Sequence, residues 1–278
     1  SSDGIIELAD GCLCCTVRGE LVDTLSNLID RLQTGRIKAL SRIIIETTGL
    51  ADPAPVLASI MGHPALAQAL RLDGVITAVD AVNGAATLDN HIEAVKQAAV
   101  ADRIVLTKTD LAAGGAREVQ IMARLRRLNP GATILLAAAD EASVAALFNC
   151  GLYDPATKTA DVARWLNEEG FRGHGHHGHH HHDVNRHDAS VSAFTLIHDA
   201  PVPMAAAQMF LDLLRSAHGE RLLRMKGIIC LAEDPDRPLV IHAVQSVMHP
   251  PARLKEWQGD DRRTRLVIIT KDMPESFV

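Results

Sequence analysis

The sequence RIVLTKTD, residues 103–110, joins an apolar run to a polar turn that contains one lysine and one aspartate. Three consecutive aliphatic residues between a charged residue and a turn predict a short buried strand. The same form recurs in RIIIE (42–46), GVITAVD (74–80) and ATILL (132–136), and IIEL (5–8) is also strand-like. The chain is therefore predicted to contain a series of short strands, several of which end in a charged residue.

Amphipathic segments lie between these strands. Leucines at positions 21, 25, 28 and 32 recur at helical spacing, so residues 20–34 are predicted to form a helix with one buried face. Further helices are expected near residues 54–70, 87–99 and 115–128. Strands that alternate with helices predict right-handed βαβ units and an α/β fold, in which helices cover both faces of a mostly parallel sheet.

Composition excludes several classes of protein. The 278 residues are 47% hydrophobic and 22% charged, which is typical of a globular protein with a sizeable core. A net charge of −6 provides no general attraction for nucleic acid or for an anionic membrane. No apolar run reaches the roughly 18 residues that a membrane span needs. Three of the five cysteines fall within four positions, unlike a secreted disulfide framework, so we expect a cytoplasmic protein without nucleic-acid or membrane partners.

The character of the chain changes after residue 153. Residues 154–188 are polar and end in HGHHGHHHH (174–182), which cannot form a core, so we interpret this segment as a linker. Beyond it, short apolar runs predict strands near residues 190–198, 222–232, 239–244 and 265–270. A helix is expected near 203–218. We therefore predict an α/β domain over residues 1–153, a histidine-rich linker, and a small α+β domain over residues 189–278.

The cluster GCLCC (11–15) places Cys12, Cys14 and Cys15 within four positions. Thiolates are soft ligands that favour Zn²⁺, Cu⁺ and similar ions over Mg²⁺ or Ca²⁺. Three cysteines on one loop, between an expected strand and the start of a helix, can converge on one ion and leave a coordination position open. We interpret them as a transition-metal site; the alternative is three small buried residues in a turn.

A second motif, ETTGLADP (46–53), follows the strand expected at residues 42–46. A carboxylate at the carboxyl end of a parallel strand is where nucleotide-hydrolysing folds place the group that holds Mg²⁺. Glu46 is the candidate for this role, and Gly49 would let a backbone N–H approach the terminal phosphate. The alternative is an ordinary strand that ends in a glutamate.

The turn at residues 107–110 has the form [Asn/Thr]-Lys-x-Asp, which is the motif that reads guanine. In that motif the aspartate accepts hydrogen bonds from two guanine N–H groups, and the lysine stem packs on the base. Adenine lacks this pair of donors, so the selection is chemical. Thr107, Lys108 and Asp110 are therefore the candidate guanine-binding residues, and the alternative is a solvated turn.

The order of these features is that of a P-loop GTPase. Glu46, Asp80 and the turn at 107–110 each close a successive predicted strand. Such a fold also places a small-residue loop near the base, for which Ala137–Ala139 is the candidate. The phosphate-binding loop Gly-x-x-x-x-Gly-Lys-[Ser/Thr] does not occur, and the sequence contains no Gly-Lys pair.

Taken together, these motifs resemble the CobW-type GTPases, relatives of the nickel-insertion GTPases that serve urease and hydrogenase. GCLCC looks like the family's Gly-Cys-x-Cys-Cys signature, residues 46–53 look like its Glu-[Ser/Thr]-x-Gly-x-Ala-Asp-Pro motif, and residues 107–110 look like its guanine motif. The histidine run lies where many members carry one. The family's C-terminal domain is resembled by LRMKG (223–227), Val244-Gln245 and LVII (266–269).

The resemblance implies a metallochaperone with GTP and Mg²⁺ as cofactors. It would bind a transition metal at the cysteine loop and transfer it to a client metalloprotein when GTP is hydrolysed. Zn²⁺ is the first choice because three thiolates suit it, while Co²⁺ and Ni²⁺ fit the same ligands. Neutral imidazoles on the linker would load or buffer the metal, namely His174, His176, His177, His179, His180, His181 and His182. The oligomeric state stays open, and an oligomer is compatible with the sequence.

In the family, the phosphate loop and first switch segment precede the cysteine signature by several dozen residues. This chain begins with Ser1, just ahead of that signature, so we interpret it as truncated at the N-terminus. We expect the full-length protein to hydrolyse GTP and these 278 residues alone to bind GTP poorly and not turn it over. Two alternatives stay open: a non-enzymatic metal buffer or sensor, and a cobalt-handling accessory protein of cobalamin biosynthesis.

Overall fold

A computed structural model describes residue 6 and residues 15–112, 115–148, 150, 166 and 190–275 of the chain. By its internal contacts the chain divides into two compact units, Ser1–Arg71 and Leu72–Val278, which we describe separately. Within the described residues, no helix combines the length and the apolar character that a membrane crossing requires.

The first unit is helical in its described part, with α1 (Cys15–Gln33), α2 (Pro53–Gly62) and α3 (Pro64–Ala69). The helix expected at 20–34 is confirmed, and its buried Leu21 and Leu25 pack with Val56 of α2 and Leu66 of α3. The segment expected near 54–70 forms two helices. Pro64 explains the break, because a proline cannot donate to the helix ladder and disfavours helical geometry in the residue before it.

The prediction of a strand at residues 42–46 is wrong. Residues 39–48 have no regular structure, and Ile44 is 72% exposed. A strand is stabilised by hydrogen bonds to a neighbouring strand, and no strand in the described part of the chain pairs with this segment. The strand expected at residues 5–8 lies outside the described residues, except for Ile6.

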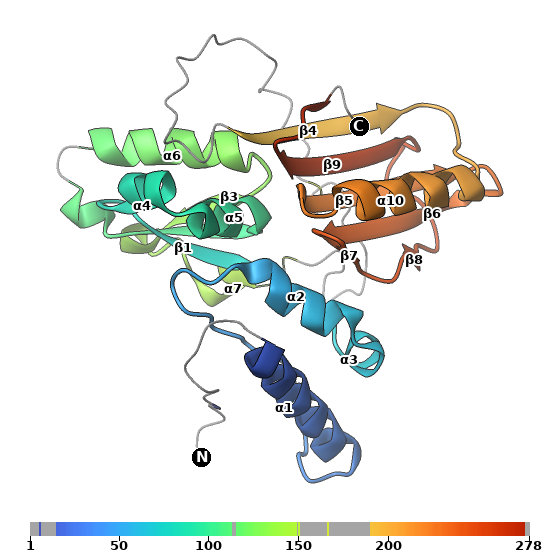
Figure 1. The fold of residues 1–278 in the computed structure, drawn as a ribbon, viewed down its shortest axis with the longest axis horizontal. Coiled ribbons are helices and arrows are strands. Elements are labelled where there is room, and N and C mark those ends of the chain that lie inside the picture. The colour runs from blue at the N-terminus through green and yellow to red at the C-terminus, as the bar shows by residue number, and fades with distance from the viewer. Residues whose placement is uncertain are drawn as a thin grey trace. The chain divides into compact units, whose positions relative to one another are not determined.

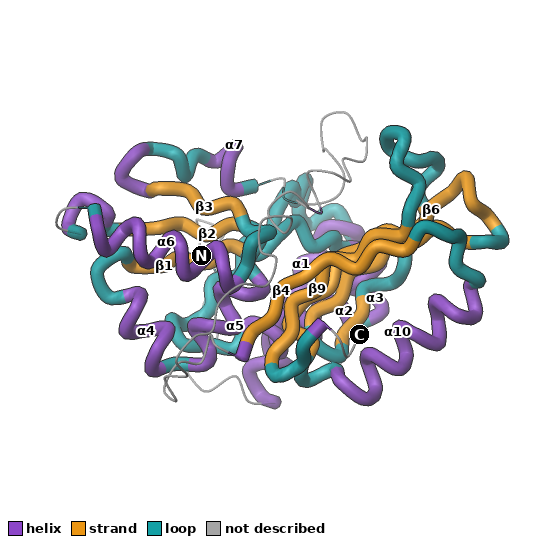
Figure 2. Tube along the Cα trace, turned by 90° about the horizontal axis from the view of Figure 1, so that it is seen from above, coloured by secondary structure: helices purple, strands orange, loops and turns teal. Residues whose placement is uncertain are grey.

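The second unit contains a parallel three-stranded sheet in the order β1-β2-β3, formed by β1 (Ile76–Asp80), β2 (Arg103–Thr107) and β3 (Thr133–Leu136). All three strands were predicted. Their register is continuous, so Asp80 lies opposite Thr107 at the carboxyl end. Because all three strands are parallel and in register, their carboxyl ends lie at the same end of the sheet. Figure 2 shows the three strands side by side.

Helices bury one face of this sheet. Ile104 and Leu106 of β2 are completely buried in a cluster with Val95 of α5 and Leu125 of α6, whereas the alternate side chains of β2 are half-buried. The helices and short 3-10 turns of this region are α4 (Gly84–Asn90), α5 (Ile92–Val100), η1 (Thr109–Leu111), α6 (Ala116–Leu128), η2 (Ala137–Ala139) and α7 (Val144–Leu147). This part of the chain is therefore α/β. The helix predicted near 115–128 corresponds to α6, the one predicted near 87–99 forms the two helices α4 and α5, and α7 was not predicted.

The chain ends in an antiparallel sheet in the order β4-β9-β5-β6-β7, and β8 pairs with β6. Its elements are β4 (Val191–His198), α10 (Met204–His218), β5 (Leu222–Leu231), β6 (Asp234–Val244), β7 (Val247–Met248), β8 (Ala252–Arg253) and β9 (Thr264–Lys271). The predicted α+β arrangement is thus confirmed. The short strands β7 and β8 carry no sequence pattern that predicts them.

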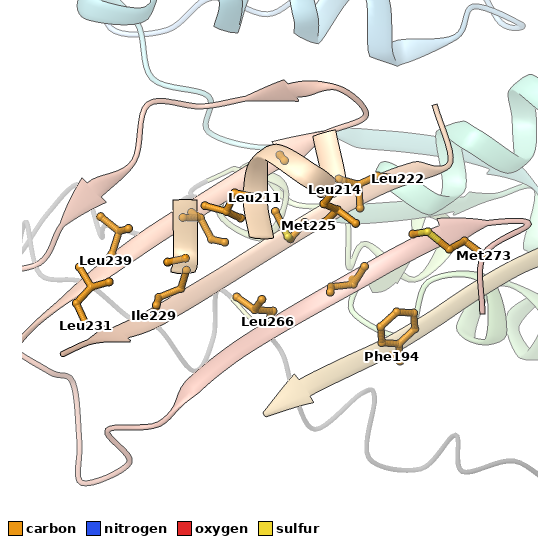
Figure 3. Packing of buried hydrophobic residues seen from close by; sticks show 14 residues of the cluster. Phe194, Leu211, Leu214, Leu222, Met225, Ile229, Leu231, Leu239, Leu266 and Met273 are labelled. Atoms are coloured by element: carbon orange, nitrogen blue, oxygen red, sulfur yellow. The ribbon is translucent and has the colours of Figure 1, made fainter. Parts of the chain in front are cut away.

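Helix α10 covers one face of the antiparallel sheet (Figure 1). Leu211 and Leu214 of α10 pack on Met225, Ile229 and other buried side chains of the sheet (Figure 3). Every residue of β5 is buried, because its opposite face is also covered. That second face carries Arg224 and Lys226, and it meets the amino end of the parallel sheet.

Candidate functional site

The turn that follows β2 carries the residues of the predicted guanine motif. Lys108 adopts a left-handed backbone conformation, with φ 57° and ψ 32°, and the chain then enters the single turn η1. The side chains of Lys108 and Asp110 are exposed. No hydrogen-bond or ion-pair partner for the Asp110 carboxylate occurs among the described residues. This carboxylate is therefore available to an incoming ligand.

The turn after β1 supports Lys108. Its Nζ lies 2.7 Å from Oδ2 of Asp80, the last residue of β1. Oδ1 of Asp80 accepts hydrogen bonds from the backbone N–H groups of Val82 at 2.7 Å and Asn83 at 3.1 Å. The hydrogen bond from Lys108, with those from the turn, lowers the pKa of Asp80 to about 2 despite the opposing effect of burial. Asp80 therefore remains ionised at neutral pH.

The small-residue loop expected near the base is present. Ala137–Ala139 forms η2 directly after β3, and η1 and η2 contact each other. The turn at 107–110 and this alanine turn thus lie at the same end of the parallel sheet, where open α/β folds bind their ligands.

The motif at residues 46–53 lies in the first unit. Glu46 and Gly49 are exposed, and the backbone N–H of Ala51 donates to the carbonyl of Thr48. Asp52 caps α2, because its Oδ1 accepts a hydrogen bond from the N–H of Ala54 at 3.0 Å. The structure thus gives the Asp-Pro end of this motif a structural role that sequence reasoning did not assign. Glu46 and Asp110 belong to different compact units.

The predicted metal ligands fall largely outside the described residues. Cys15 is the first residue of α1, and Cys12 and Cys14 are not described. The same holds for the linker histidines His174, His176, His177, His179, His180, His181 and His182. Within the part of the chain that is described, no three histidine, cysteine or acidic side chains are grouped closely enough to hold a metal ion. The metal site therefore stays a prediction.

Sequence reasoning missed a buried charge cluster at the opposite end of the parallel sheet. Asp102, directly before β2, accepts hydrogen bonds through Oδ1 from Arg224 at 2.7 Å and Lys226 at 2.5 Å. Its Oδ2 accepts one from the N–H of Val75 at 2.9 Å, and its carbonyl accepts one from Thr133. Asp102 thus joins the starts of β1, β2 and β3 to β5. The sequence feature that could have revealed this cluster is the run Leu223–Gly227, which places two cations in an otherwise apolar strand.

Burial and charge oppose each other in this cluster. Burial alone would raise the pKa of Asp102, but the charges of Arg224 and Lys226 hold it below its usual range. Burial lowers the pKa of Lys226 to about 8, and the attraction of Asp102 offsets only part of that effect. Burial, together with the charges of Arg224 and Lys226, holds the pKa of His242 well below its usual range, so His242 is neutral at pH 7.

Comparison with known proteins agrees with this architecture. Residues 1–136 match the CobW/HypB/UreG nucleotide-binding domain, and residues 191–278 match the cobalamin synthesis protein CobW C-terminal domain. The chain is 30% identical over 274 residues to the zinc chaperone YjiA of Escherichia coli strain K12, an alignment that covers 98% of this chain and 79% of the relative. It is 31% identical over 307 residues to the zinc chaperone CobW of a Sinorhizobium species, covering 100% of this chain and 79% of that protein.

Solved structures extend the agreement to three dimensions. The crystal structure of Zn(II)-bound YjiA GTPase from E. coli matches with a TM-score of 0.66 and 27% identity, covering 91% of this chain and 73% of that one. A parallel sheet with this order of motifs, followed by an antiparallel sheet under one helix, defines a nucleotide-binding protein with a P-loop GTPase fold. The chain belongs to the CobW/HypB/UreG family.

Proposed function

We propose that this protein is a GTP-dependent metallochaperone that carries Zn²⁺ to a client metalloprotein. The observation that supports it best is the turn after β2, in which Lys108 and Asp110 are exposed and η1 contacts η2. Two relatives of this chain are zinc chaperones, which supports zinc as the cargo.

The chemistry of this turn selects guanine. Asp110 is a carboxylate without a protein partner in the described chain, so both of its oxygens can accept hydrogen bonds from a base. Guanine offers two adjacent N–H donors on one edge, while adenine does not. The Lys108 stem supplies an apolar surface on which the base packs, and Thr107 ties β2 to β1 because its Oγ1 donates to the carbonyl of Val79 at 3.3 Å.

Glu46 and Gly49 would serve the phosphate side. Glu46 is exposed in a segment without regular structure, so its carboxylate is accessible to a hydrated cation. A carboxylate is the type of ligand that Mg²⁺ prefers, and Mg²⁺ would neutralise charge that develops on the terminal phosphate. A side chain at position 49 would meet no other atom within 4 Å, so there is space around this glycine.

Cys12, Cys14 and Cys15 would hold the metal cargo. Their thiolates favour Zn²⁺, and Co²⁺ or Ni²⁺ would be accepted by the same donors. The histidines between residues 174 and 182 would collect metal with little selectivity and pass it to the cysteines. In this proposal, GTP binding favours the metal-holding state, and hydrolysis releases the ion to the client.

The replacement Asp110→Asn tests the nucleotide part of this proposal. An asparagine amide donates where the aspartate accepts, so it opposes the guanine N–H groups and matches the carbonyl that xanthine carries instead of an amino group. In the complete gene product, we expect GTP affinity to fall by about 100-fold and xanthosine triphosphate to bind better than GTP. Asp212→Asn, on the exposed face of α10, is the matched control and should leave both affinities unchanged. If GTP binding is the same in Asp110→Asn and wild type, the turn does not read the base.

A further inference from the structure

The Asp80 carboxylate is fully engaged by neighbouring donors. Oδ1 accepts the N–H groups of Val82 and Asn83, and Oδ2 accepts Lys108 Nζ at 2.7 Å and Asn83 Nδ2 at 3.3 Å. An ionised carboxylate has about four acceptor positions, so these four donors saturate it. Asp80 therefore has no capacity left to accept a hydrogen bond from a nucleotide base, in contrast to Asp110.

The anchoring of Asp80 is local and rigid. The backbone N–H groups that it accepts come from the turn between β1 and α4, and Asn83 directs its side chain to Asp80 although it stands at the cap position of α4. The N–H of Ala81 also donates to the carbonyl of Thr107 at 2.9 Å, which fixes the end of β1 against the end of β2. The carboxylate thus occupies a defined place relative to the backbone of Lys108.

The ion pair with Asp80 fixes the direction of the Lys108 side chain. A lysine has four rotatable side-chain bonds, and the Lys108 side chain is 54% exposed, so its stem would sample many rotamers without a fixed contact. Its left-handed backbone conformation sets where the stem begins. The ion pair with Asp80 sets where it ends. Together they fix both ends of the stem at the carboxyl end of the sheet.

We propose that Asp80 is a positioning residue of the guanine site, which holds the Lys108 stem in place as the surface on which the base packs. The inference rests on the proposed function, because it assumes that a base binds at this turn. Ordering the stem before binding removes an entropy cost that binding would otherwise carry. A fixed negative charge also neutralises the ammonium group when the base partly covers it, and Asp80, with a pKa of about 2, supplies that charge throughout the neutral range.

The alternative is that the ion pair competes with the ligand. In that case Lys108 must leave Asp80 before the base can bind, and breaking the pair would improve affinity. The two possibilities predict changes of opposite sign. The replacement Asp80→Asn separates them, because it keeps an oxygen that can accept the Val82 and Asn83 N–H groups while it removes the charge that Lys108 contacts.

A double-mutant cycle tests the proposal in the complete gene product. Affinity for guanosine diphosphate is measured for wild type, Asp80→Asn, Lys108→Met and the double variant, since methionine keeps an apolar stem without the charge. We expect Asp80→Asn to weaken binding by about threefold to tenfold, as for a partly exposed ion pair. In the Lys108→Met background, Asp80→Asn should have no further effect. A similar weakening in both backgrounds, or tighter binding by Asp80→Asn, would overturn the proposal.

Inosine diphosphate distinguishes failure of this inference from failure of the proposed function. It lacks the amino group that Asp110 reads but offers the same face to the Lys108 stem. Asp80→Asn should weaken both nucleotides equally, whereas Asp110→Asn should change their ratio. If Asp110→Asn leaves the ratio unchanged, the guanine site itself is wrong. If Asp110→Asn changes the ratio and Asp80→Asn affects neither nucleotide, only the positioning role of Asp80 is wrong.

Discussion

The carboxylate of Asp102 accepts a hydrogen bond from the guanidinium of Arg224 at 2.7 Å, although 122 positions separate them in the sequence. Arg224 also donates to the carbonyl of Val100, at the end of α5. Asp102 in turn holds the N–H of Val75 and receives the N–H of Thr133 at its carbonyl. The antiparallel sheet is thus attached to the amino ends of the same three strands whose carboxyl ends carry the candidate nucleotide site.

Replacing Asp102 with alanine should strongly destabilise the protein. Arg224 and Lys226 would remain buried without their shared counter-charge, which costs about 3–5 kcal/mol in comparable sites. Chemical denaturation monitored by circular dichroism measures the loss. The control is Asp212→Ala, which breaks an exposed aspartate–arginine pair at 2.9 Å. A similar loss in the free energy of unfolding in the two variants would show that burial does not increase the contribution of this ion pair to stability.

The lowered pKa of Lys226 predicts an unusual pH dependence of the free energy of unfolding. Its pKa is lowered by burial from 10.5 to about 8, so between these values the unfolded chain binds more protons at this group than the folded protein does. The contribution of Lys226 to the free energy of unfolding should therefore rise with pH from about 8 to 10.5, by about 1–3 kcal/mol, and be constant below that window. Urea unfolding of wild type and Lys226→Met across this range checks the prediction. Parallel stability curves for the two proteins would contradict it.

The side-chain amide nitrogen of Asn129 should stabilise the protein, because it donates to carbonyls at the end of α5. Its buried Nδ2 donates to the carbonyls of Ala98, Ala99 and Ala101 at 2.9 to 3.0 Å, which satisfies the end of α5. Asn129→Ala removes this donor, although the carbonyl of Ala98 still accepts the N–H of Ala101. The replacement should reduce the free energy of unfolding by about 1–3 kcal/mol. Asn90→Ala is the control, because Asn90 makes a similar bond to Ala86 on the exposed surface. An equal loss in the two variants would rule out the special role of burial.

Gly227 in β5 has no room for a side chain. A Cβ atom there would lie 2.2 Å from Cδ2 of Leu266 and 3.1 Å from the carbonyl oxygen of Arg265. Leu266 is buried and cannot move freely, so Gly227→Ala should destabilise the antiparallel sheet by about 1–3 kcal/mol. Gly19→Ala, in α1, meets no atom within 4 Å and should be neutral or stabilising. Thermal unfolding of both variants measures the difference.

Much of the fold follows from local patterns in the sequence. The apolar runs before Asp80 and Thr107 predict β1 and β2, because each is short, aliphatic and bounded by polar residues. Residues 42–46 have the same pattern and form no strand, since a strand also requires a neighbour, which a local pattern does not specify. Pro64 is a visible signal for the break between α2 and α3.

The candidate site was predictable only in part. Lys108 and Asp110 belong to a local motif, and their spacing alone was enough to predict a guanine-binding turn. The contact between Asp80 and Lys108 spans 28 positions and exists because β1 and β2 are adjacent and in register. The pairing of Asp102 with Arg224 and Lys226 depends on how two sheets pack against each other, and no spacing rule specifies that. Long-range contacts between charged groups are therefore the part that sequence reasoning missed.

In the proposed function, a thiolate metal site is coupled to a nucleotide site. The most direct measurement is a Zn²⁺ titration of the complete gene product with a competing chelator, with and without GTP, for wild type and for the variant with Cys12, Cys14 and Cys15 changed to serine. We predict that the variant loses about 100-fold or more in Zn²⁺ affinity, and that GTP changes the affinity of the wild type only. Equal affinity of the two proteins for Zn²⁺ would contradict the account.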